Sequence, residues 1–297
     1  MRHLPAMEKQ QKAELGVIGG SGLYDLDVLE NVETMRLETP FGDPSDEFLL
    51  GTLSGVRVAF LPRHGKGHRI SPTELNFRGN IHAMKQLGVR RLLSVGAVGS
   101  LREEIPPGDL VVPDQFLDRT FHRDATFFDR GVVAHVQFGD PVCATLAAAV
   151  AASAKTTDAK VHEGGTYVCM EGPQFSTRAE SNLYRSWGAS IIGMTNLQEA
   201  KLAREAEMCF STLALSTDYD CWHEEEEDVD VAAIVAVIQA NAARAAETIA
   251  SLAGRMPKGD CACHSSLAGA ILTDVSTVSA EARERLALIA GAYLESA

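Results

Sequence analysis

The stretch Leu15-Gly16-Val17-Ile18-Gly19-Gly20-Ser21-Gly22 is a short apolar run that ends in three glycines and a serine. It predicts a buried strand followed by a sharp turn. Glycine lets backbone N–H groups converge on an anion, and the Ser21 hydroxyl adds a donor. An ordinary tight turn explains the same residues equally well. The stretch does not fit G-x-G-x-x-G, and no Lys-Ser or Lys-Thr follows it, so a dinucleotide or NTP site is disfavoured.

Outward from this stretch, strands and helices are predicted to alternate. Short apolar runs bounded by Gly, Pro or charge predict strands, and amphipathic runs predict helices. The predicted strands span 15–18, 56–61, 91–95, 110–112, 165–170, 190–194 and 210–217. The predicted helices span 74–87, 177–187, 196–205, 229–252 and 279–295. This alternation indicates an α/β fold, a mixed or parallel sheet with helices on its faces.

The size of the chain suits one large α/β domain or two small ones, since it has 297 residues of which 45% are apolar. The sequence contains no internal repeat. The pattern breaks near 254–266, where Pro257 and Gly259 interrupt it. We therefore expect a single domain over 15–255, an N-terminal extension over 1–14 and a partly helical C-terminal extension over 256–297, with both extensions loosely attached.

Charge and hydropathy exclude several classes of partner. The net charge of −13 argues against nucleic acid, although a few local donors can still hold a small anion. The longest apolar stretch, Cys143–Ala154, has 12 residues, whereas a membrane span needs about 20. Residues 1–14 mix charges and lack the apolar run of a secretory signal. We expect a cytoplasmic protein without nucleic-acid or membrane partners.

The six cysteines are too few for a disulfide framework in a chain of this length. Four of them are isolated in or beside apolar segments and are expected to be buried reduced thiols: Cys143, Cys169, Cys209 and Cys221. The sequence Cys-Ala-Cys-His at 261–264 is compatible with a metal site or a redox pair. Zinc requires four ligands, and no second pair lies nearby in the sequence. We therefore expect a surface linker with free thiols and no metal site.

Two further loops follow predicted strands. Residues 63–68 contain four basic side chains and two glycines, so Arg63 could bind two phosphate oxygens as a fork, with His64 as a second donor. A solvated basic loop is the alternative. Residues 95–100, Val-Gly-Ala-Val-Gly-Ser, predict a third loop where backbone approaches a ligand. Three such loops would meet at one edge of an open sheet, where α/β proteins bind ligands.

Aromatic and acidic residues follow two later strands. Phe175 could stack on a base or a sugar, or pack in the core. Asp218 and Asp220 end the apolar run 210–217, where paired carboxylates are unexpected in a core. They could bind a metal, form an acid–base pair or hydrogen-bond a heterocycle. The acidic run 224–228 is interpreted as a solvated loop that leads into a helix N-terminus.

Taken in order, these motifs resemble the 5′-methylthioadenosine phosphorylase branch of the trimeric purine nucleoside phosphorylase family. The resemblance runs from about 15 to about 255 and is weak outside these limits. Its motifs are Gly-Gly-Ser-Gly (19–22), Thr-Pro-Phe-Gly (39–42), Arg-His-Gly (63–65), Gly-Ser-Leu-Arg (99–102), Pro-Gly-Asp (107–109), Glu-Gly-Pro (171–173), Ser-Thr-Arg-Ala-Glu (176–180), Met-Thr (194–195) and Thr-Asp-Tyr-Asp-Cys-Trp (217–222).

The resemblance implies a mixed, partly barrel-like sheet, a homotrimer, and inorganic phosphate as a co-substrate with no cofactor. It places phosphate binding at Ser21, Arg63, His64, Gly96, Ala97 and Thr195. It places Met194 at the ribose, and Phe175, Asp218 and Asp220 at the base. It makes His135, Val231 and Ile234 the lining of a 5′-alkylthio pocket, with His135 reaching in from a neighbouring subunit. Ser176, Val231 and Ile234 are the expected specificity positions.

Two positions depart from the family. Gly96 stands where a hydroxyl residue is usual, so we expect weaker phosphate binding. Gly193 stands where Asn is frequent, which removes a polar contact near the base.

The implied reaction is phosphorolysis of the purine–ribose bond. Positioned phosphate attacks the anomeric carbon with inversion, and Asp220 assists the leaving base. A carboxylate accepts from a 6-amino group, so adenine is favoured over a 6-oxopurine. A 6-oxopurine or methylthioinosine phosphorylase, a hydrolytic nucleosidase and a non-catalytic purine binder are the alternatives.

Overall fold

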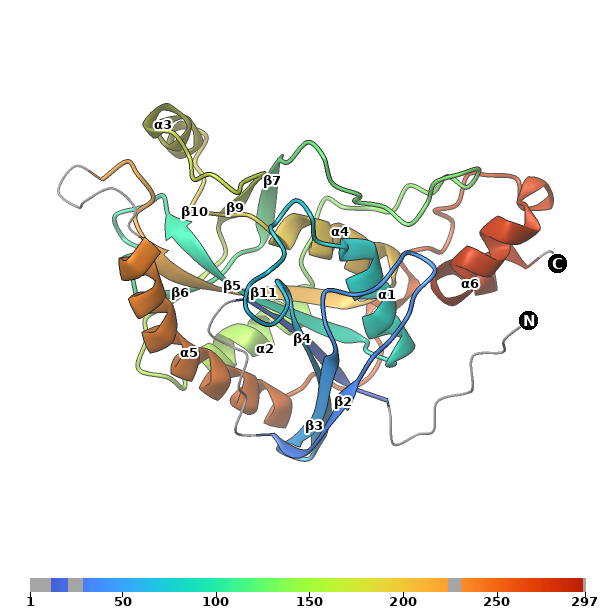
Figure 1. Ribbon diagram of the computed structural model, residues 1–297, viewed down its shortest axis with the longest axis horizontal. Coiled ribbons are helices and arrows are strands. Elements are labelled where there is room, and N and C mark those ends of the chain that lie inside the picture. The colour runs from blue at the N-terminus through green and yellow to red at the C-terminus, as the bar shows by residue number, and fades with distance from the viewer. Residues whose placement is uncertain (1–11, 21–28, 224–230, 296–297) are drawn as a thin grey trace.

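The computed structural model describes residues 12–20, 29–223 and 231–295. Within these ranges the chain forms one sheet of eleven strands with helices on its faces (Figure 1). The strands are β1 Leu15–Gly19, β2 Glu30–Met35, β3 Phe48–Leu53, β4 Val56–Pro62, β5 Arg91–Ser100, β6 Leu110–Val112, β7 Gln115–Arg119, β8 Val161–Glu163, β9 Thr166–Met170, β10 Ile191–Gly193 and β11 Cys209–Asp218. The helices are α1 Phe77–Gln86, α2 Ala144–Ala154, α3 Arg178–Ser186, α4 Asn196–Glu205, α5 Val231–Gly254 and α6 Ala280–Leu294, with 3-10 helices η2 Ala262–Ser265 and η3 Val275–Thr277.

Four parallel strands form the centre of the sheet. β1 pairs in parallel with β4 on one side and with β5 on the other, and β5 also pairs in parallel with β11. Every residue of β1 is buried, as its apolar sequence predicts for a central strand. Because these strands run in one direction, the chain segments that follow Gly19, Pro62 and Asp218 emerge at the same edge of the sheet.

The mixed α/β fold is confirmed, with one correction to its shape. The strand order β2-β3-β4-β1-β5-β10-β9-β7 branches at β5, where β11, β6 and β8 continue separately. The pairings among the described strands leave the sheet open, so it is not a barrel. The branch arises because β5 runs for ten residues: β11 pairs with it along residues 91–99, whereas β1 pairs with residues 91–95 and β10 with residues 99–100.

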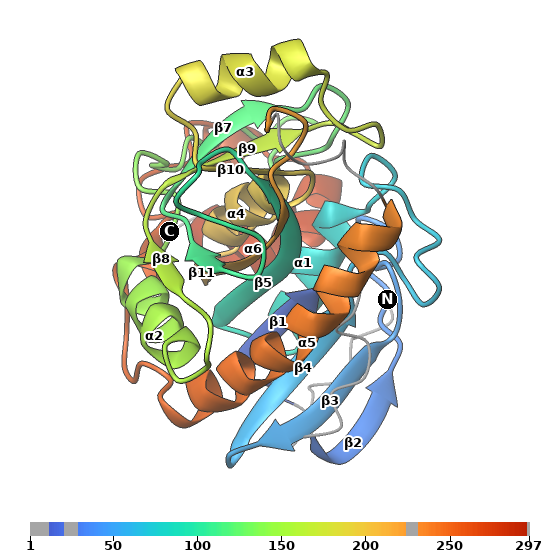
Figure 2. The same ribbon diagram turned by 90° about the vertical axis from the view of Figure 1, so that its left-hand side faces the viewer.

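The helices cover both faces of the sheet. α1, α4 and α6 share one hydrophobic cluster, and α2 and α5 share another, in which they pack against β11 (Figures 1 and 2). α3 lies at the end of the sheet next to β7 and β9 (Figure 2). Its N-terminus is a capping box, in which the Thr177 hydroxyl accepts from the Glu180 N–H and the Glu180 carboxylate accepts from the Thr177 N–H. No described helix is long and apolar enough to cross a membrane.

The C-terminal segment is packed on the domain, in contrast to the loose attachment expected from its sequence. α6 begins at the cap residue Ser279, whose hydroxyl accepts from the Ala282 N–H. Leu286 and Ile289 of α6 are buried in the cluster that contains α1 and α4. The sequence could not predict this docking. An amphipathic pattern indicates that a helix has an apolar face, but it does not indicate which surface that face packs against.

We expect the Leu286→Ala variant to lose about 2–5 kcal/mol of unfolding free energy, because it opens a cavity at a fully buried position. Leu288 lies two residues away on the same helix and is 40% exposed, so Leu288→Ala should change stability by less than about 0.5 kcal/mol. Chemical denaturation of the two variants measures both values. Equal losses would show that α6 does not dock as described.

Candidate active site

A cavity of about 290 Å³ lies at the edge of the sheet where β1, β4 and β11 end. It brings together most of the residues that the motifs singled out. Its lining includes Gly20, Arg63, His64, His68, Gly96, Ala97, Gly99, Phe175, Ile192, Gly193, Met194, Thr195, Asp218 and Asp220. Segments that are up to 200 residues apart in sequence thus form one site, as the convergence of strand ends predicted.

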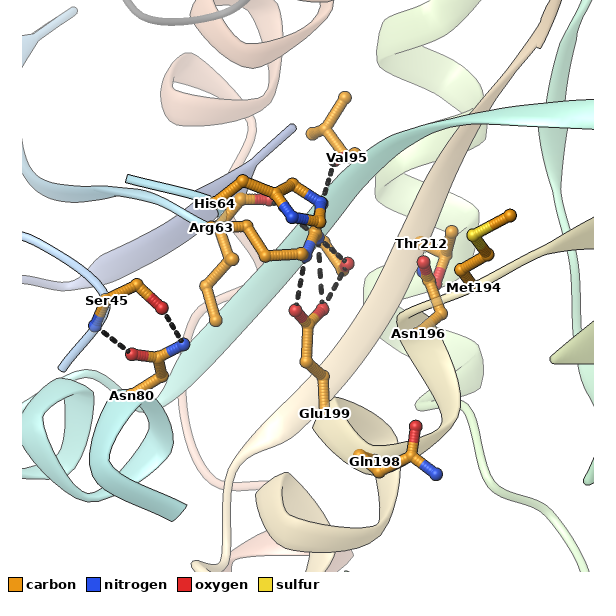
Figure 3. Close-up of polar contacts among 12 residues, drawn as sticks. Ser45, Arg63, His64, Asn80, Val95, Met194, Asn196, Gln198, Glu199 and Thr212 are labelled. Carbon is orange, nitrogen blue, oxygen red and sulfur yellow. Dashed lines mark hydrogen bonds and ion pairs between the residues drawn. The ribbon is translucent and has the colours of Figure 1, made fainter. Parts of the chain in front are cut away.

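Arg63 follows β4 and is almost fully buried, with a relative exposure of 1%. Its Nε donates to Glu199 Oε1 at 2.6 Å and its Nη2 to Glu199 Oε2 at 3.1 Å (Figure 3). Nη2 also donates to Ser94 Oγ at 2.7 Å. Nη1 donates to Val95 O at 3.0 Å, and Nη2 reaches Ile18 O at 3.2 Å. The guanidinium therefore joins β1, β4, β5 and α4 at one point.

This network corrects the expected role of the Arg63 fork. A guanidinium has five N–H donors, and the bidentate pair is already bound to Glu199 rather than open to phosphate. Only Nη1 has a hydrogen left over. A Cβ at Gly20 would stand 3.3 Å from Nη1 and a Cβ at Gly96 would stand 3.5 Å from it, so these two glycines keep the space beside Nη1 open. Arg63 can therefore give an anion one contact at the floor of the cavity.

His64 has a different protonation state from the donor that the sequence suggested. Burial, with Arg63 as a further cause, lowers the pKa of His64 to about 4, so the ring is neutral at pH 7. Its Nδ1 lies 2.8 Å from Ile70 O and must carry the hydrogen to donate to that carbonyl. Nε2 is then an acceptor. Such a ring can receive a hydrogen bond from a protonated phosphate oxygen, but it cannot donate one.

Thr195 is the N-cap residue of α4, and its hydroxyl makes no cap hydrogen bond. It is 7% exposed and lines the cavity, so the positive end of the α4 dipole faces the space beside Arg63. A helix N-terminus of this kind favours an anion. Together with the backbone at Gly96 and Ala97, it completes an anion-binding end of the cavity.

The other end of the cavity carries two carboxyl groups in different environments. Asp218 accepts from the Thr217 hydroxyl and from the Asp220 N–H, each at 2.7 Å. Asp220 is 7% exposed, and its Oδ2 has no hydrogen-bond partner among the described residues. Burial, followed by the Asp218 charge, raises the pKa of Asp220 to about 6, which the nearby Ser181 hydroxyl lowers only in part.

The backbone around these carboxyl groups is fixed by the residues after them. Asp220 has a φ of +55°, an uncommon conformation for a residue other than glycine. Trp222 is buried, its Nε1 donates to Ser100 O at 2.8 Å, and the Arg185 guanidinium lies 3.4 Å from the ring centroid. A side chain at Gly99 would stand 2.9 Å from Asp218 Oδ1. Gly99 lies within β5 rather than in the predicted loop. Its lack of a side chain leaves room for the Asp218 carboxylate.

Gly193 departs from the family pattern for a steric reason. A Cβ at this position would stand 2.0 Å from the Tyr167 hydroxyl. Tyr167 is fully buried, and burial raises its pKa far above the ordinary value, so it remains a neutral phenol. The phenol occupies the space that a side chain at 193 would need. Tyr167 therefore excludes any side chain at position 193.

Several predicted site residues are either outside the described part of the chain or away from the lining of this cavity. Ser21 lies outside the described residues, as do the side chains of Val231 and Ile234 in the first turn of α5. Ser176 lies beside the cavity, and its Oγ is 3.5 Å from Met170 Sδ. His135 lies on a separate cavity of about 680 Å³, so within this chain it does not reach the site.

Sequence reasoning missed the residues that support the cavity from behind. Glu199 and Gln198 of α4 are fully buried, and Arg123 donates to Gln198 Oε1, to Glu171 and to Met194 O. One signal in the sequence could have indicated them. The predicted helix at 196–205 begins with three polar residues in four positions, Asn196, Gln198 and Glu199, between two predicted buried strands. Buried polar residues of that kind require partners.

The fold and the cavity define a class: an α/β protein that binds an anion and a heterocycle next to each other at the carboxyl ends of parallel strands. A family model described as the phosphorylase superfamily matches residues 14–255. The chain therefore belongs to the phosphorylase superfamily.

Three relatives illustrate this membership. The S-methyl-5′-thioadenosine phosphorylase of Geobacter sulfurreducens is 60% identical over 282 residues, which cover 94% of this chain and 99% of the relative. The crystal structure of a methylthioadenosine phosphorylase from an antarctic soil metagenomic library is 48% identical, with a TM-score of 0.88 over 94% of this chain and 99% of that one. The methylthioadenosine phosphorylase of Schistosoma mansoni in complex with adenine is 35% identical, with a TM-score of 0.80 over 84% and 93%.

We expect Arg63→Met to destabilise the protein by about 3–5 kcal/mol, because it leaves the Glu199 carboxylate buried without its cation. The double variant Arg63→Met/Glu199→Gln removes that stranded charge and should recover part of the loss. Chemical denaturation of the two variants and the parent measures the difference. A single variant within about 1 kcal/mol of the parent would contradict a buried pair of this importance.

Proposed function

We propose that this protein cleaves the N-glycosidic bond of 5′-methylthioadenosine with inorganic phosphate, giving adenine and 5-methylthioribose 1-phosphate. The observation that carries the proposal is a single cavity with an anion-binding end and, across from it, a buried carboxyl group whose pKa is raised. The relatives named S-methyl-5′-thioadenosine phosphorylase support the choice of nucleoside.

At the anion-binding end, phosphate is held by one Arg63 Nη1 hydrogen, the Thr195 hydroxyl and the start of α4, and its own hydroxyl donates to His64 Nε2. Bond cleavage develops positive charge on the sugar, and a phosphate held beneath it stabilises that charge. The phosphate oxygen then bonds to the anomeric carbon as the bond to the base breaks. Binding replaces a bimolecular encounter with a fixed geometry, which is the main contribution expected of these residues.

At the base end, Asp220 serves the departing purine. The leaving base takes the electron pair of the broken bond, and a neutral Asp220 can give it a proton. Its raised pKa keeps a fraction protonated near neutral pH. Phe175 is 46% exposed at the cavity mouth, where it can cover the base face. Asp218, held by its own donors, keeps Asp220 from ionising easily.

The preference for adenine follows from the same carboxyl group. Asp220 Oδ2 has no partner among the described residues, so it can accept from a 6-amino group. A 6-oxo group offers an acceptor only, so it would compete with the departing nitrogen for the single Asp220 proton and would leave the acceptor oxygen of Asp220 unpaired in a buried site. Val231 and Ile234, which the resemblance assigns to the alkylthio pocket, are apolar residues that suit a methylthio group.

We further propose a homotrimer in the cytoplasm that needs no cofactor for this reaction. His135 would complete the alkylthio pocket of a neighbouring subunit. Its segment is paired with 270–272, and the flanking side chains Val133 and Leu272 are 48% and 66% exposed. Exposed apolar side chains of this kind are typical of a subunit interface, and here they lie beside His135, which does not reach the cavity of its own chain. Phosphate and the carboxyl group supply the nucleophile and the proton, so each step balances without another reagent.

Turnover of methylthioadenosine should require inorganic phosphate and release methylthioribose 1-phosphate rather than free methylthioribose. The physical reason is that the anion-binding end positions phosphate, and nothing in its described residues activates water. Product analysis by mass spectrometry at varied phosphate concentrations measures this. Full activity in phosphate-free buffer, with the free sugar as product, would instead establish a hydrolase. Tight adenine and phosphate binding without turnover would establish a purine-binding protein.

Asp220→Asn should lower kcat/KM for methylthioadenosine by about two orders of magnitude or more, because a positioned general acid contributes about 10²–10⁴-fold. The new amide can donate to a 6-oxo group, so the loss with methylthioinosine should be much smaller or reversed. The two substrates are measured side by side on protein whose folding is verified. Equal losses would show that Asp220 does not read the base.

The pH profile tests the proton on Asp220 separately. The carboxyl group is protonated below its raised pKa of about 6 and loses the proton above it. The kcat/KM of the parent enzyme should therefore contain a limb that falls as the pH rises through about 6. The same limb should be missing in Asp220→Asn. A limb that persists unchanged in the variant would assign the proton to another group.

A further inference from the structure

Four cysteine thiols that are far apart in the sequence meet at the end of the sheet opposite the cavity. Cys143 precedes α2, Cys209 begins β11, and Cys261 and Cys263 lie at the start of η2. Their sulfur atoms all lie within 4.8 Å of one another, and Cys143 Sγ is 3.7 Å from Cys261 Sγ. All four are free thiols. The expectation of no metal site assumed that no second pair of ligands was near 261–264, and the fold supplies that pair.

We propose that these four cysteines bind one zinc ion as a structural site. Four Zn–S bonds of about 2.3 Å in a tetrahedron separate the sulfur atoms by about 3.8 Å. The observed spacing matches that arrangement, and it is too long for a covalent S–S bond of about 2.05 Å. Four thiolate ligands leave no open coordination position, so the site would hold structure and not perform catalysis.

The surroundings suit the charge of such a centre. Zinc with four thiolates carries two net negative charges. A cavity of about 330 Å³ is lined by Cys143, Cys209 and Cys261 together with two basic residues, Arg91 and Lys258, and one acidic residue, Asp260, whose carboxylate is paired with Arg90. Cys143 stands at the N-terminus of α2, where the helix dipole favours negative charge. Basic residues outnumber acidic ones in this cavity, and a helix N-terminus lies at one of the sulfur atoms, in a protein whose net charge is otherwise strongly negative.

His264 supports one of the ligands from outside the cluster. Its Nδ1 accepts from the Cys261 N–H at 3.2 Å and lies 2.6 Å from Arg90 Nη2, which can only donate. The ring hydrogen must therefore be on Nε2, which lies 3.5 Å from Cys209 Sγ. An N–H aimed at a sulfur atom is the contact that stabilises a thiolate ligand of a metal. The histidine of the Cys-Ala-Cys-His motif thus has a role without ligating the metal.

The site would join the C-terminal segment to the domain. Cys261 and Cys263 lie between α5 and α6, whereas Cys143 and Cys209 belong to the domain core. Metal binding to ligands from both parts adds its free energy to the docking of that segment. Asp218 lies at the other end of the ten-residue β11, about 30 Å from Cys209 at about 3.3 Å per residue. Zinc should therefore affect stability far more than turnover.

The test uses the full-length protein, purified anaerobically from zinc-supplemented cells without chelators. Elemental analysis should find one zinc per chain, and the Cys261→Ser/Cys263→Ser variant should retain less than a tenth of it. Cys169→Ser removes a buried thiol outside the cluster and should keep one zinc per chain. Chelation of zinc from the parent protein, and the double substitution, should each lower Tm. Both should leave kcat/KM at 25 °C within about twofold.

A second measurement holds even if the double variant fails to fold. The chelated parent protein, given Co²⁺, should develop the intense visible bands of tetrahedral cobalt bound to thiolates, and added Zn²⁺ should abolish them. Absence of zinc with no cobalt spectrum would overturn the site. Two disulfides among these cysteines, detected by intact mass of the anaerobic protein, would overturn it as well. One iron per chain would overturn the assignment of zinc.

Discussion

The buried ion pair between Arg63 and Glu199 is the constraint on which the anion-binding end of the cavity depends. The guanidinium is 1% exposed and the carboxylate is fully buried, so neither can be solvated by water. The other hydrogen bonds that Arg63 donates go to backbone carbonyls of β1 and β5 and to the Ser94 hydroxyl. A buried pair of this kind contributes little net stability compared with apolar packing, but it tolerates few geometries. It therefore sets the relative positions of β1, β4, β5 and the first part of α4 before any ligand arrives.

The two carboxyl groups show how one short loop can hold an acid and a base side by side. Asp218 accepts hydrogen bonds from Thr217 and from the Asp220 N–H, and Asp220 is buried with an oxygen that none of the described residues satisfies. Burial, followed by the Asp218 charge, raises the pKa of Asp220 to about 6. Maintaining Asp220 at positive φ and out of water is unfavourable in isolation. The buried Trp222 and the Arg185 guanidinium on its ring keep the loop in that conformation.

The central strands could be predicted from the sequence because their apolar runs are continuous. β2 could not, since its sequence Glu-Asn-Val-Glu-Thr-Met is exposed and polar, and it is a strand only through its pairing with β3. α2 is largely alanine and has no amphipathic stripe, so its 11 residues indicated only a short apolar segment. The motifs identified the lining of the cavity. They could not reveal Glu199, whose partner is 136 residues away, because ion pairing across the fold leaves no local pattern.

The same limit on prediction applies to the four clustered cysteines, which lie at the opposite end of β11 from Asp218. Ligand spacing in a sequence reveals a metal site only when the pairs are close, whereas Cys143 and Cys209 are brought in by α2 and β11. β11 is buried along nearly its whole length, and Asn196 Nδ2 donates to Thr212 Oγ1 of this strand at 2.7 Å. Over about 30 Å, two unit charges interact by only about 0.1–0.6 kcal/mol for effective dielectric constants of about 80 to 20. A charged cluster at the start of the strand can therefore secure the C-terminal segment without disturbing the protonation of Asp220 beyond its end.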